Sequence, residues 1–125
     1  MIRDLDLLVI GAGPAGYYAS IHAAKAGLRT ALVEKEFPGG TCLNWGCIPT
    51  KTLHRSAKLF RTMLQADQFG IRTGSVQLQP DRIFARKNEV VEKMRQAMRQ
   101  NLQGVGVRYI EGSASLLKNH MAQIQ

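Results

Sequence analysis

The chain has 125 residues, a formal net charge of +8 and only two cysteines, and 45% of its residues are hydrophobic. This length suits one domain with its own core, and the hydrophobic content excludes a largely disordered chain. No apolar run approaches the ~20 residues that span a bilayer, so we expect no membrane segment.

The positive charge lies in the second part of the chain. Residues 1–50 carry four basic and four acidic side chains, whereas residues 51–125 carry 13 basic and five acidic ones. The basic residues there are mixed with acidic and apolar residues, and only four aromatic residues lie among them, without regular alternation. This pattern is typical of solvated helix faces, so we predict no nucleic-acid partner.

The opening residues and the cysteine count bear on the compartment. Asp4 and Asp6 lie where a signal peptide needs an apolar stretch, so we expect no export signal and a cytoplasmic location. Two cysteines without a secretory context favour redox or metal chemistry in a reducing compartment over a structural disulfide scaffold.

The first 34 residues predict a strand, a helix and a second strand in succession. Residues 5–10 form a short apolar run that ends in Gly-Ala-Gly, as a buried parallel strand does. Residues 15–26 are rich in alanine and lack proline, which favours a helix, and Gly27 is placed to cap its end. Residues 30–33 predict another buried strand, which completes a βαβ unit.

A loop and a long, interrupted helix come next. Residues 35–40 contain one proline and two glycines, which predicts a loop. A helix is expected over residues 41–66, interrupted or irregular near Pro49, because proline is tolerated only in a first turn or at a kink. Two turn glycines mark residues 67–80 as a connection.

A second long helix is predicted over residues 81–104. Its apolar residues recur at helical spacing, which predicts one stripe that packs in the core. The stripe consists of Ile83, Phe84, Val90, Val91, Met94, Met98 and Leu102. Residues 105–110 then predict a strand, Gly112 and Ser113 a break, and residues 114–117 a further short strand.

A glycine-rich turn follows the first predicted strand. GAGPAG over residues 11–16 matches GxGxxG in the context that a dinucleotide site needs, between a strand and a helix. Gly11 permits the tight turn, Gly13 lets the backbone approach a pyrophosphate, and Gly16 lets the helix pack closely on the strand. Glu34 lies 18 residues after Gly16, where an acid accepts hydrogen bonds from a ribose and disfavours the 2′-phosphate of NADP. The pattern does not separate FAD from NAD, and its alternative is a tight turn without a ligand.

Both cysteines, Cys42 and Cys47, lie beside the start of the interrupted helix. A helix N-terminus offers free N–H groups and a positive dipole end, which favour a thiolate. The spacing allows a small disulfide ring that thiol exchange would open. Gly40 and Gly46 leave room for a flat ring system to approach the sulfurs, and Lys51 places a cation one turn beyond Cys47.

Two alternatives to redox chemistry remain open for the cysteines. They are two buried, inert thiols, as free cysteines often are, or half of a metal site. Zinc needs about four ligands, and the nearby histidines, His22 and His54, do not complete a standard spacing. A thiol pair beside a nucleotide site favours electron transfer between a cofactor and a disulfide.

Together these segments resemble a known enzyme family. GAGPAG, Glu34 and GGTCLNWGCIPTK over residues 39–51 resemble the N-terminal part of the FAD-dependent pyridine nucleotide–disulfide oxidoreductases, and most of all the dihydrolipoyl dehydrogenases among them. The resemblance covers essentially the whole chain. It implies an α/β fold, a Rossmann-like FAD-binding domain with a parallel sheet and helices, incomplete at its C-terminal end. Glutathione and mercuric reductases carry near variants of the cysteine motif and stay open as alternatives.

The resemblance also implies a role for each candidate residue. Cys42 would attack the substrate disulfide, and Cys47 would contact the flavin, with Lys51 near the flavin's central ring. Backbone around Gly112 and Ala114 would contact the adenine end of FAD. The full set of implied FAD contacts is Gly11, Gly13, Pro14, Ala15, Gly16, Glu34, Lys35, Gly40, Thr41, Cys42, Gly46, Cys47, Lys51, Gly112 and Ala114.

Residues 1–125 resemble only the N-terminal portion of an FAD-binding domain in this family. The resemblance places the NAD domain, the dimer-interface domain, the closing strands of the sheet and an acid–base His–Glu pair outside this sequence. The histidines present, His22, His54 and His120, do not match that pair and are expected on the surface. An incomplete sheet also predicts an unpaired edge strand.

The implied reaction is dihydrolipoamide and NAD to lipoamide and NADH, through a Cys42–Cys47 disulfide and FAD. The implied cofactor is FAD, with NAD expected only for a full-length enzyme. The implied partner is a small-molecule or lipoyl-domain disulfide or dithiol, and the full-length form would be a homodimer. We expect no turnover by this chain alone. The alternative class of function is a non-enzymatic, truncated module that binds a nucleotide or a partner and uses its thiols as a redox sensor.

Overall fold

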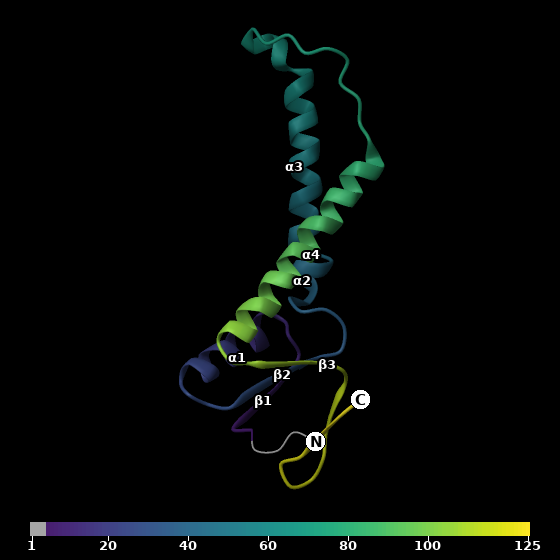
Figure 1. The fold of residues 1–125 in the computed structure, drawn as a ribbon. Helices are drawn as coiled ribbons and strands as arrows, with labels where there is room; N and C mark the ends of the chain where they lie inside the picture. Colours follow the sequence, from purple (N-terminus) through teal and green to yellow (C-terminus); the bar gives the residue numbers. More distant parts are fainter. Residues whose placement is uncertain (1–4) are drawn as a thin grey trace.

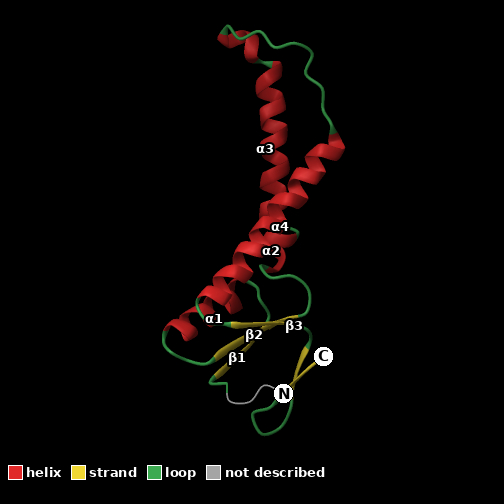
Figure 2. Ribbon diagram, in the orientation of Figure 1, coloured by secondary structure: helices red, strands yellow, loops and turns green. Residues whose placement is uncertain are grey.

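The computed structural model describes residues 5–125, so part of the opening segment used for the export prediction lies outside the described residues. A small α/β base carries an arm of two long helices (Figure 1), and all the strands lie in the base (Figure 2). The base holds β1 (Leu7–Ile10), α1 (Pro14–Lys25), β2 (Thr30–Glu34), β3 (Arg108–Glu111), β4 (Ala114–Leu116) and β5 (Ala122–Ile124). The arm holds α2 (Gly40–Asn44), α3 (Cys47–Leu64), the 3-10 helix η1 (Ala66–Phe69) and α4 (Pro80–Gly104).

The sheet of the base is parallel, with β2 between β1 and β3. Leu8 pairs with Ala31, and Leu32 pairs with Tyr109. Residues 30–33 of β2 are all buried, as expected for a central parallel strand. The predicted βαβ unit and the α/β fold class are confirmed. Within residues 5–125, β1 and β3 each have a neighbour on one side only, so both are edge strands of this sheet.

The end of α1 has the glycine cap that the sequence predicts. Ala26 closes the helix, and Gly27 beyond it has a φ of +86°. The N–H of Leu28 donates to the carbonyl of Ala23 (3.1 Å), and the N–H of Gly27 donates to that of Ala24 (3.0 Å). This pair of bonds is the Schellman motif, which turns the chain toward β2.

The hydrophobic core lies where the sheet, α1 and the inner end of α4 meet. It consists of Ala12, Tyr17, Ile21, Leu32, Leu102 and Val107. The Nδ2 of Asn101 on α4 donates a hydrogen bond to the Tyr17 hydroxyl on α1 (2.6 Å). The core therefore holds the inner end of α4 against the base, and the outer part of α4 runs beyond the sheet beside α3 (Figure 1).

The interrupted helix predicted over residues 41–66 is divided into two helices. α2 ends at Asn44, Trp45 and Gly46 form the break, and α3 begins at Cys47. Pro49 is the third residue of α3. Proline is tolerated there because the first N–H groups of a helix have no partner within it.

The apolar stripe of α4 is only partly core, so that prediction is wrong for Phe84 and Met94. Val91 and Leu102 are buried, whereas Phe84 is 55% exposed and Met94 is 39% exposed. The bounds of α4 match the prediction. The physical reason at Phe84 is position, because the outer end of α4 runs beyond the sheet, whereas Val91 lies near Asn44 and Trp45.

The C-terminal strands differ from the prediction at two points. β3 starts at Arg108 rather than at Val105, because Val105 still caps α4 and Gly106 turns the chain with a φ of +82°. β4 forms as predicted, but it pairs antiparallel with β5, a strand that the sequence pattern did not predict. Asn119 and His120 turn the chain between them with φ values of 59° and 56°. Asparagine tolerates this region, so Asn119 is the signal that was available.

Candidate functional site

The glycine-rich turn joins β1 to α1 as the fingerprint predicts. Gly11 has a φ of +98°, a backbone conformation that residues with a side chain rarely adopt. A Cβ built on Gly16 would lie 1.9 Å from the Gly11 carbonyl oxygen and 3.1 Å from Val9 Cγ1, so only glycine fits between α1 and β1. A Cβ built on Gly13 would meet no heavy atom within 4 Å. The backbone at Gly13 is therefore open from outside, and the N-terminus of α1 presents its N–H groups there.

Glu34 at the end of β2 lies against this turn. Its carboxylate accepts the N–H of Ala12 at 2.7 Å and the N–H of Glu36 at 3.1 Å. The N–H of Gly112, after β3, donates to the Glu34 carbonyl at 2.9 Å. Glu34, the acid predicted from its spacing, thus hydrogen-bonds directly to the turn. Each of its carboxylate oxygens keeps a further lone pair for another donor.

The loop before α2 also contacts the turn. The N–H of Gly39 donates to the carbonyl of Ala12 at 2.7 Å. A Cβ built on Gly40 would lie 3.1 Å from Gly13 Cα, and Gly40 has a φ of +63°. Glycine at this position therefore allows two backbones to approach closely. The contact places the segment that carries the cysteines beside the fingerprint, as the sequence suggests.

The two cysteines lie on either side of the helix break. Cys42 is the third residue of α2 and Cys47 is the first residue of α3, and both are exposed, unlinked thiols. The alternative of two buried, inert cysteines is therefore wrong. Gly46 joins the two helices, and a Cβ built on it would lie 3.1 Å from the Thr41 carbonyl oxygen.

The pKa of Cys42 is raised above its usual value. The largest cause is a hydrogen bond with the Cys47 side chain, followed by partial desolvation of the thiol. The backbone N–H of Cys47 and the charge of Lys51 act in the opposite direction. The sequence predicts a lowered pKa for Cys42 at the helix start, and the net shift is in the opposite direction. The backbone N–H and the lysine charge that the prediction relied on are present, but they are outweighed.

The other candidate residues lie around these two segments. Those with exposed side chains are Pro14, Ala15, Lys35, Thr41 and Lys51. Ala114 lies in β4, and a Cβ built on Gly112 would be 2.6 Å from the Gln125 carbonyl oxygen, so the β4–β5 hairpin closes on Gly112. His22, His54 and His120 are all exposed, as predicted. Within residues 5–125, no group of three or more His, Cys, Asp and Glu side chains is placed to hold a metal ion.

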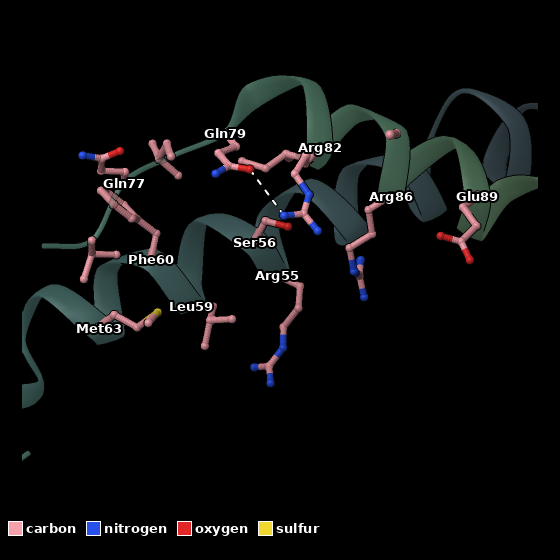
Figure 3. Close-up of a pocket in the computed structure, with 14 residues that line it drawn as sticks. Arg55, Ser56, Leu59, Phe60, Met63, Gln77, Gln79, Arg82, Arg86 and Glu89 are labelled. Atoms are coloured by element: carbon pink, nitrogen blue, oxygen red, sulfur yellow. Dashed lines mark hydrogen bonds between the residues drawn. The ribbon is translucent and has the colours of Figure 1, made fainter. Parts of the chain in front are cut away.

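Sequence reasoning missed a groove of about 790 Å³ between α3 and α4. Figure 3 shows the side chains that line it, with Arg55 and Arg86 extending from the two helices. Its apolar lining includes Leu59 and Phe60, and it shares no lining residue with the fingerprint or the cysteine segment. The apolar stripe of α4 was the available signal, although its spacing alone indicates core.

The family comparison matches nearly all of the chain. The sequence pattern of the family described as "Pyridine nucleotide-disulphide oxidoreductase" matches residues 5–123.

Within the described residues, no helix is long and apolar enough to cross a membrane.

Individual relatives agree with the family match. The dihydrolipoyl dehydrogenase of Bacillus subtilis is 50% identical over 94 residues, which are 75% of this chain and 20% of that protein. The dihydrolipoyl dehydrogenase of Mycoplasma genitalium is 40% identical over 122 residues, 97% of this chain and 27% of that protein. The Cu(II) complex of the HOCl-induced flavoprotein disulfide reductase RclA from Escherichia coli superposes with a TM-score of 0.73 at 35% identity, over 94% of this chain and 24% of that one. This chain thus spans 20–27% of the length of these proteins.

Proposed function

The chain belongs to the pyridine nucleotide-disulphide oxidoreductase family, and on that premise we propose that it is the part of a flavin-dependent disulfide oxidoreductase that holds FAD beside the Cys42–Cys47 pair. The observation that carries this proposal is the hydrogen bond between the Gly39 N–H and the Ala12 carbonyl. That bond joins the loop before α2 to the fingerprint turn. A nucleotide whose phosphates lie at the turn therefore has the thiol segment next to it.

The fingerprint turn fits such a cofactor. The backbone at Gly13 is open to a pyrophosphate, and the N-terminus of α1 stabilises its negative charge. FAD, when bound, would supply a two-electron carrier beside the thiols, which accepts electrons from the dithiol or returns them to the disulfide. The residues proposed to hold it are Gly11, Gly13, Pro14, Ala15, Gly16, Glu34, Lys35, Gly40, Thr41, Cys42, Gly46, Cys47, Lys51, Gly112 and Ala114.

The two thiols divide the disulfide chemistry between them. The Cys42 sulfur attacks a substrate disulfide and releases one substrate thiol, and the Cys47 sulfur then attacks Cys42 and releases the second. The pair ends as the Cys42–Cys47 disulfide, and the substrate is reduced by two electrons. The same exchange in reverse oxidises a dithiol substrate and leaves Cys42 and Cys47 as thiols, which is the direction that the proposed reaction with NAD requires. The raised pKa of Cys42 keeps this thiol protonated, so its attack requires a base. The family resemblance assigns that base to a partner subunit's His–Glu pair, which supports our expectation that the chain alone does not turn over.

The substrate we propose for a full-length, dimeric enzyme is the lipoyl dithiol and disulfide, with NAD as the other redox partner. The support is the set of relatives named dihydrolipoyl dehydrogenase at 40–50% identity. The second candidate is a different disulfide in the same chemistry, as in glutathione or mercuric reductases. A chain that keeps FAD and its thiols without turnover would instead act as a redox sensor.

A visible absorption spectrum of the purified chain with added FAD tests the proposal. We expect bound flavin, and a new long-wavelength band after mild thiol reduction, because the Cys47 thiolate then lies against the flavin. Cys47→Ser should abolish this band, and Cys42→Ser should preserve or strengthen it. A protein that takes up no FAD would contradict the proposal, and the reverse behaviour of the two variants would exchange the thiol roles.

A further inference from the structure

We propose that Arg95 of α4 is a positioning residue for the thiol pair, which acts through Asn44 and Phe37 to hold α2, and so Cys42, in place opposite Cys47. This inference rests on the proposed function, because it assigns what sets the redox equilibrium of the same two thiols. It concerns residues that lie outside the glycine fingerprint and the cysteine pair themselves.

Asn44 is the inner half of this arrangement. It is the last residue of α2, two positions after Cys42, and it is only 6% exposed. Its Nδ2 donates to the carbonyls of Gly40 (2.8 Å) and Pro38 (3.1 Å). One buried amide therefore ties the end of α2 to the first residue of α2 and to Pro38 in the loop that precedes it.

Arg95 reaches this amide from a helix far along the chain. Its Nε donates to Asn44 Oδ1 at 2.7 Å, and its guanidinium carbon lies 3.7 Å from the centre of the Phe37 ring. Its Nη1 pairs with Glu92 at 3.3 Å, and its side chain is 15% exposed. Because Arg95 donates to the Asn44 side-chain oxygen, the amide orientation is fixed and both amide hydrogens point at the carbonyls of Pro38 and Gly40. A planar cation that is both hydrogen-bonded and stacked gives a directional, partly desolvated contact.

Holding Asn44 in place also fixes the position of the two cysteine sulfurs, because the connection between α2 and α3 is short. Only Trp45 and Gly46 separate Asn44 from Cys47. Gly46 carries no side chain to restrict its backbone, so the relative position of the two helices depends on their contacts with the rest of the chain. Leu43, which lies against Gly39, holds one side of α2, and the Arg95–Asn44 contact holds its end.

A direct effect of the Arg95 charge on the thiols is a distinct explanation, and the electrostatics argue against it. Within the described part of the chain, the cation that acts on the Cys42 pKa is Lys51 of α3. The Arg95 charge is instead paired with Glu92. Arg95 therefore influences the thiols through the position of α2.

The consequence is measurable in the exchange reaction with glutathione. Oxidised glutathione and the Cys42–Cys47 dithiol give the protein disulfide and two molecules of reduced glutathione, so one S–S bond breaks and one forms. The equilibrium constant depends on how closely the protein holds its two sulfurs together. Loosening α2 lowers that effective concentration and makes the protein disulfide easier to reduce.

The test is the anaerobic equilibrium of the full chain with glutathione buffers, read by alkylation and mass spectrometry of the thiols. We expect Arg95→Ala to lower the equilibrium constant for disulfide formation about tenfold, which corresponds to about 30 mV. Asn44→Asp keeps an acceptor for Arg95 but loses both donors to the loop, so it should give a similar fall. Lys93→Ala is the matched control, because Lys93 lies two residues before Arg95 on α4, is exposed, and pairs with Glu89 rather than with Glu92. It should leave the constant unchanged.

Arg95→Lys keeps the charge and the aliphatic stem but lacks the planar fork, so it should fold and shift the constant by an intermediate amount. This variant replaces Arg95→Ala if the latter does not fold. Unchanged constants in folded Arg95→Lys and Asn44→Asp, or an equal fall in Lys93→Ala, would overturn the proposal. These readouts need no FAD, so failure of FAD binding by the wild-type chain leaves them valid. A wild-type chain that forms no Cys42–Cys47 disulfide would overturn the proposed function, and this inference with it.

Discussion

Gly13 and Gly16 of the fingerprint do different physical work, although the pattern GxGxxG treats them alike. A Cβ at Gly16 would lie 1.9 Å from the backbone oxygen of Gly11, whereas a Cβ at Gly13 would meet nothing within 4 Å. Gly13 also has a φ of −67°, which any residue adopts. Gly16 therefore serves the packing of α1 on β1, whereas Gly13 leaves the backbone of the turn open, as the proposed function requires.

We predict that Gly16→Ala destabilises the chain by about 3 kcal/mol, because the added methyl overpacks a rigid backbone contact. Gly13→Ala should cost less than about 1 kcal/mol but should abolish FAD binding, because its methyl occupies the open side of the turn. Urea unfolding gives the stabilities, and titration with FAD gives the binding. Normal FAD affinity in Gly13→Ala would show that the cofactor does not approach the turn there.

The pKa of Cys42 offers a second prediction for a single residue. Because the Cys47 side chain is the largest cause that raises this pKa, Cys47→Ala should lower it. The pH profile for alkylation of Cys42 by iodoacetamide should then move to lower pH. In the same background Lys51→Met should move the profile back up, because the Lys51 charge lowers the Cys42 pKa. Lys51→Arg keeps the charge and is the control, and an unmoved profile in Lys51→Met would place Lys51 away from the sulfur.

At the scale of elements, the sequence predicts what local patterns encode. The apolar run before Gly11 predicts β1, the alanine-rich stretch predicts α1, and the bounds of α4 follow from Pro80 and the helical spacing after it. Each of these signals comes from residues close together in the chain. The same holds for the spacing of Glu34, which places it at the fingerprint turn.

The elements that the sequence mispredicts depend on packing and strand-pairing contacts that the pattern of a single segment does not contain. The stripe of α4 is apolar throughout, but Phe84 is exposed because the sheet ends before it reaches that turn. β5 forms because β4 provides a pairing edge, which a local pattern does not contain. The Arg95–Asn44 contact joins residues 51 positions apart. The sequence therefore predicts that the glycine turn and the cysteine segment lie together, but not the contacts that hold them in place.

At the scale of the whole molecule, the base and the arm differ in how much they bury. Residues 30–33 of β2 are all buried, whereas Thr52 is the one buried residue among the 18 of α3. Leu59 and Leu64 on the arm are 51% and 60% exposed. Segments with few buried apolar contacts open at a lower free energy than the core does. The arm is therefore expected to be the less stable part of the chain.

We predict that amide hydrogen exchange separates the two parts. Amides of β2 and α1 should exchange slowly, and those of α3 beyond Leu53 should exchange faster, because their helical hydrogen bonds face solvent. Under the proposed function FAD binds the folded base, so added FAD should slow exchange around the fingerprint turn and leave the outer arm unchanged. Gly13→Ala with FAD is the control and should show no such protection. An arm as protected as β2 in the chain alone would mean that its apolar side chains are covered in solution, and the division into a stable base and a weaker arm would be wrong.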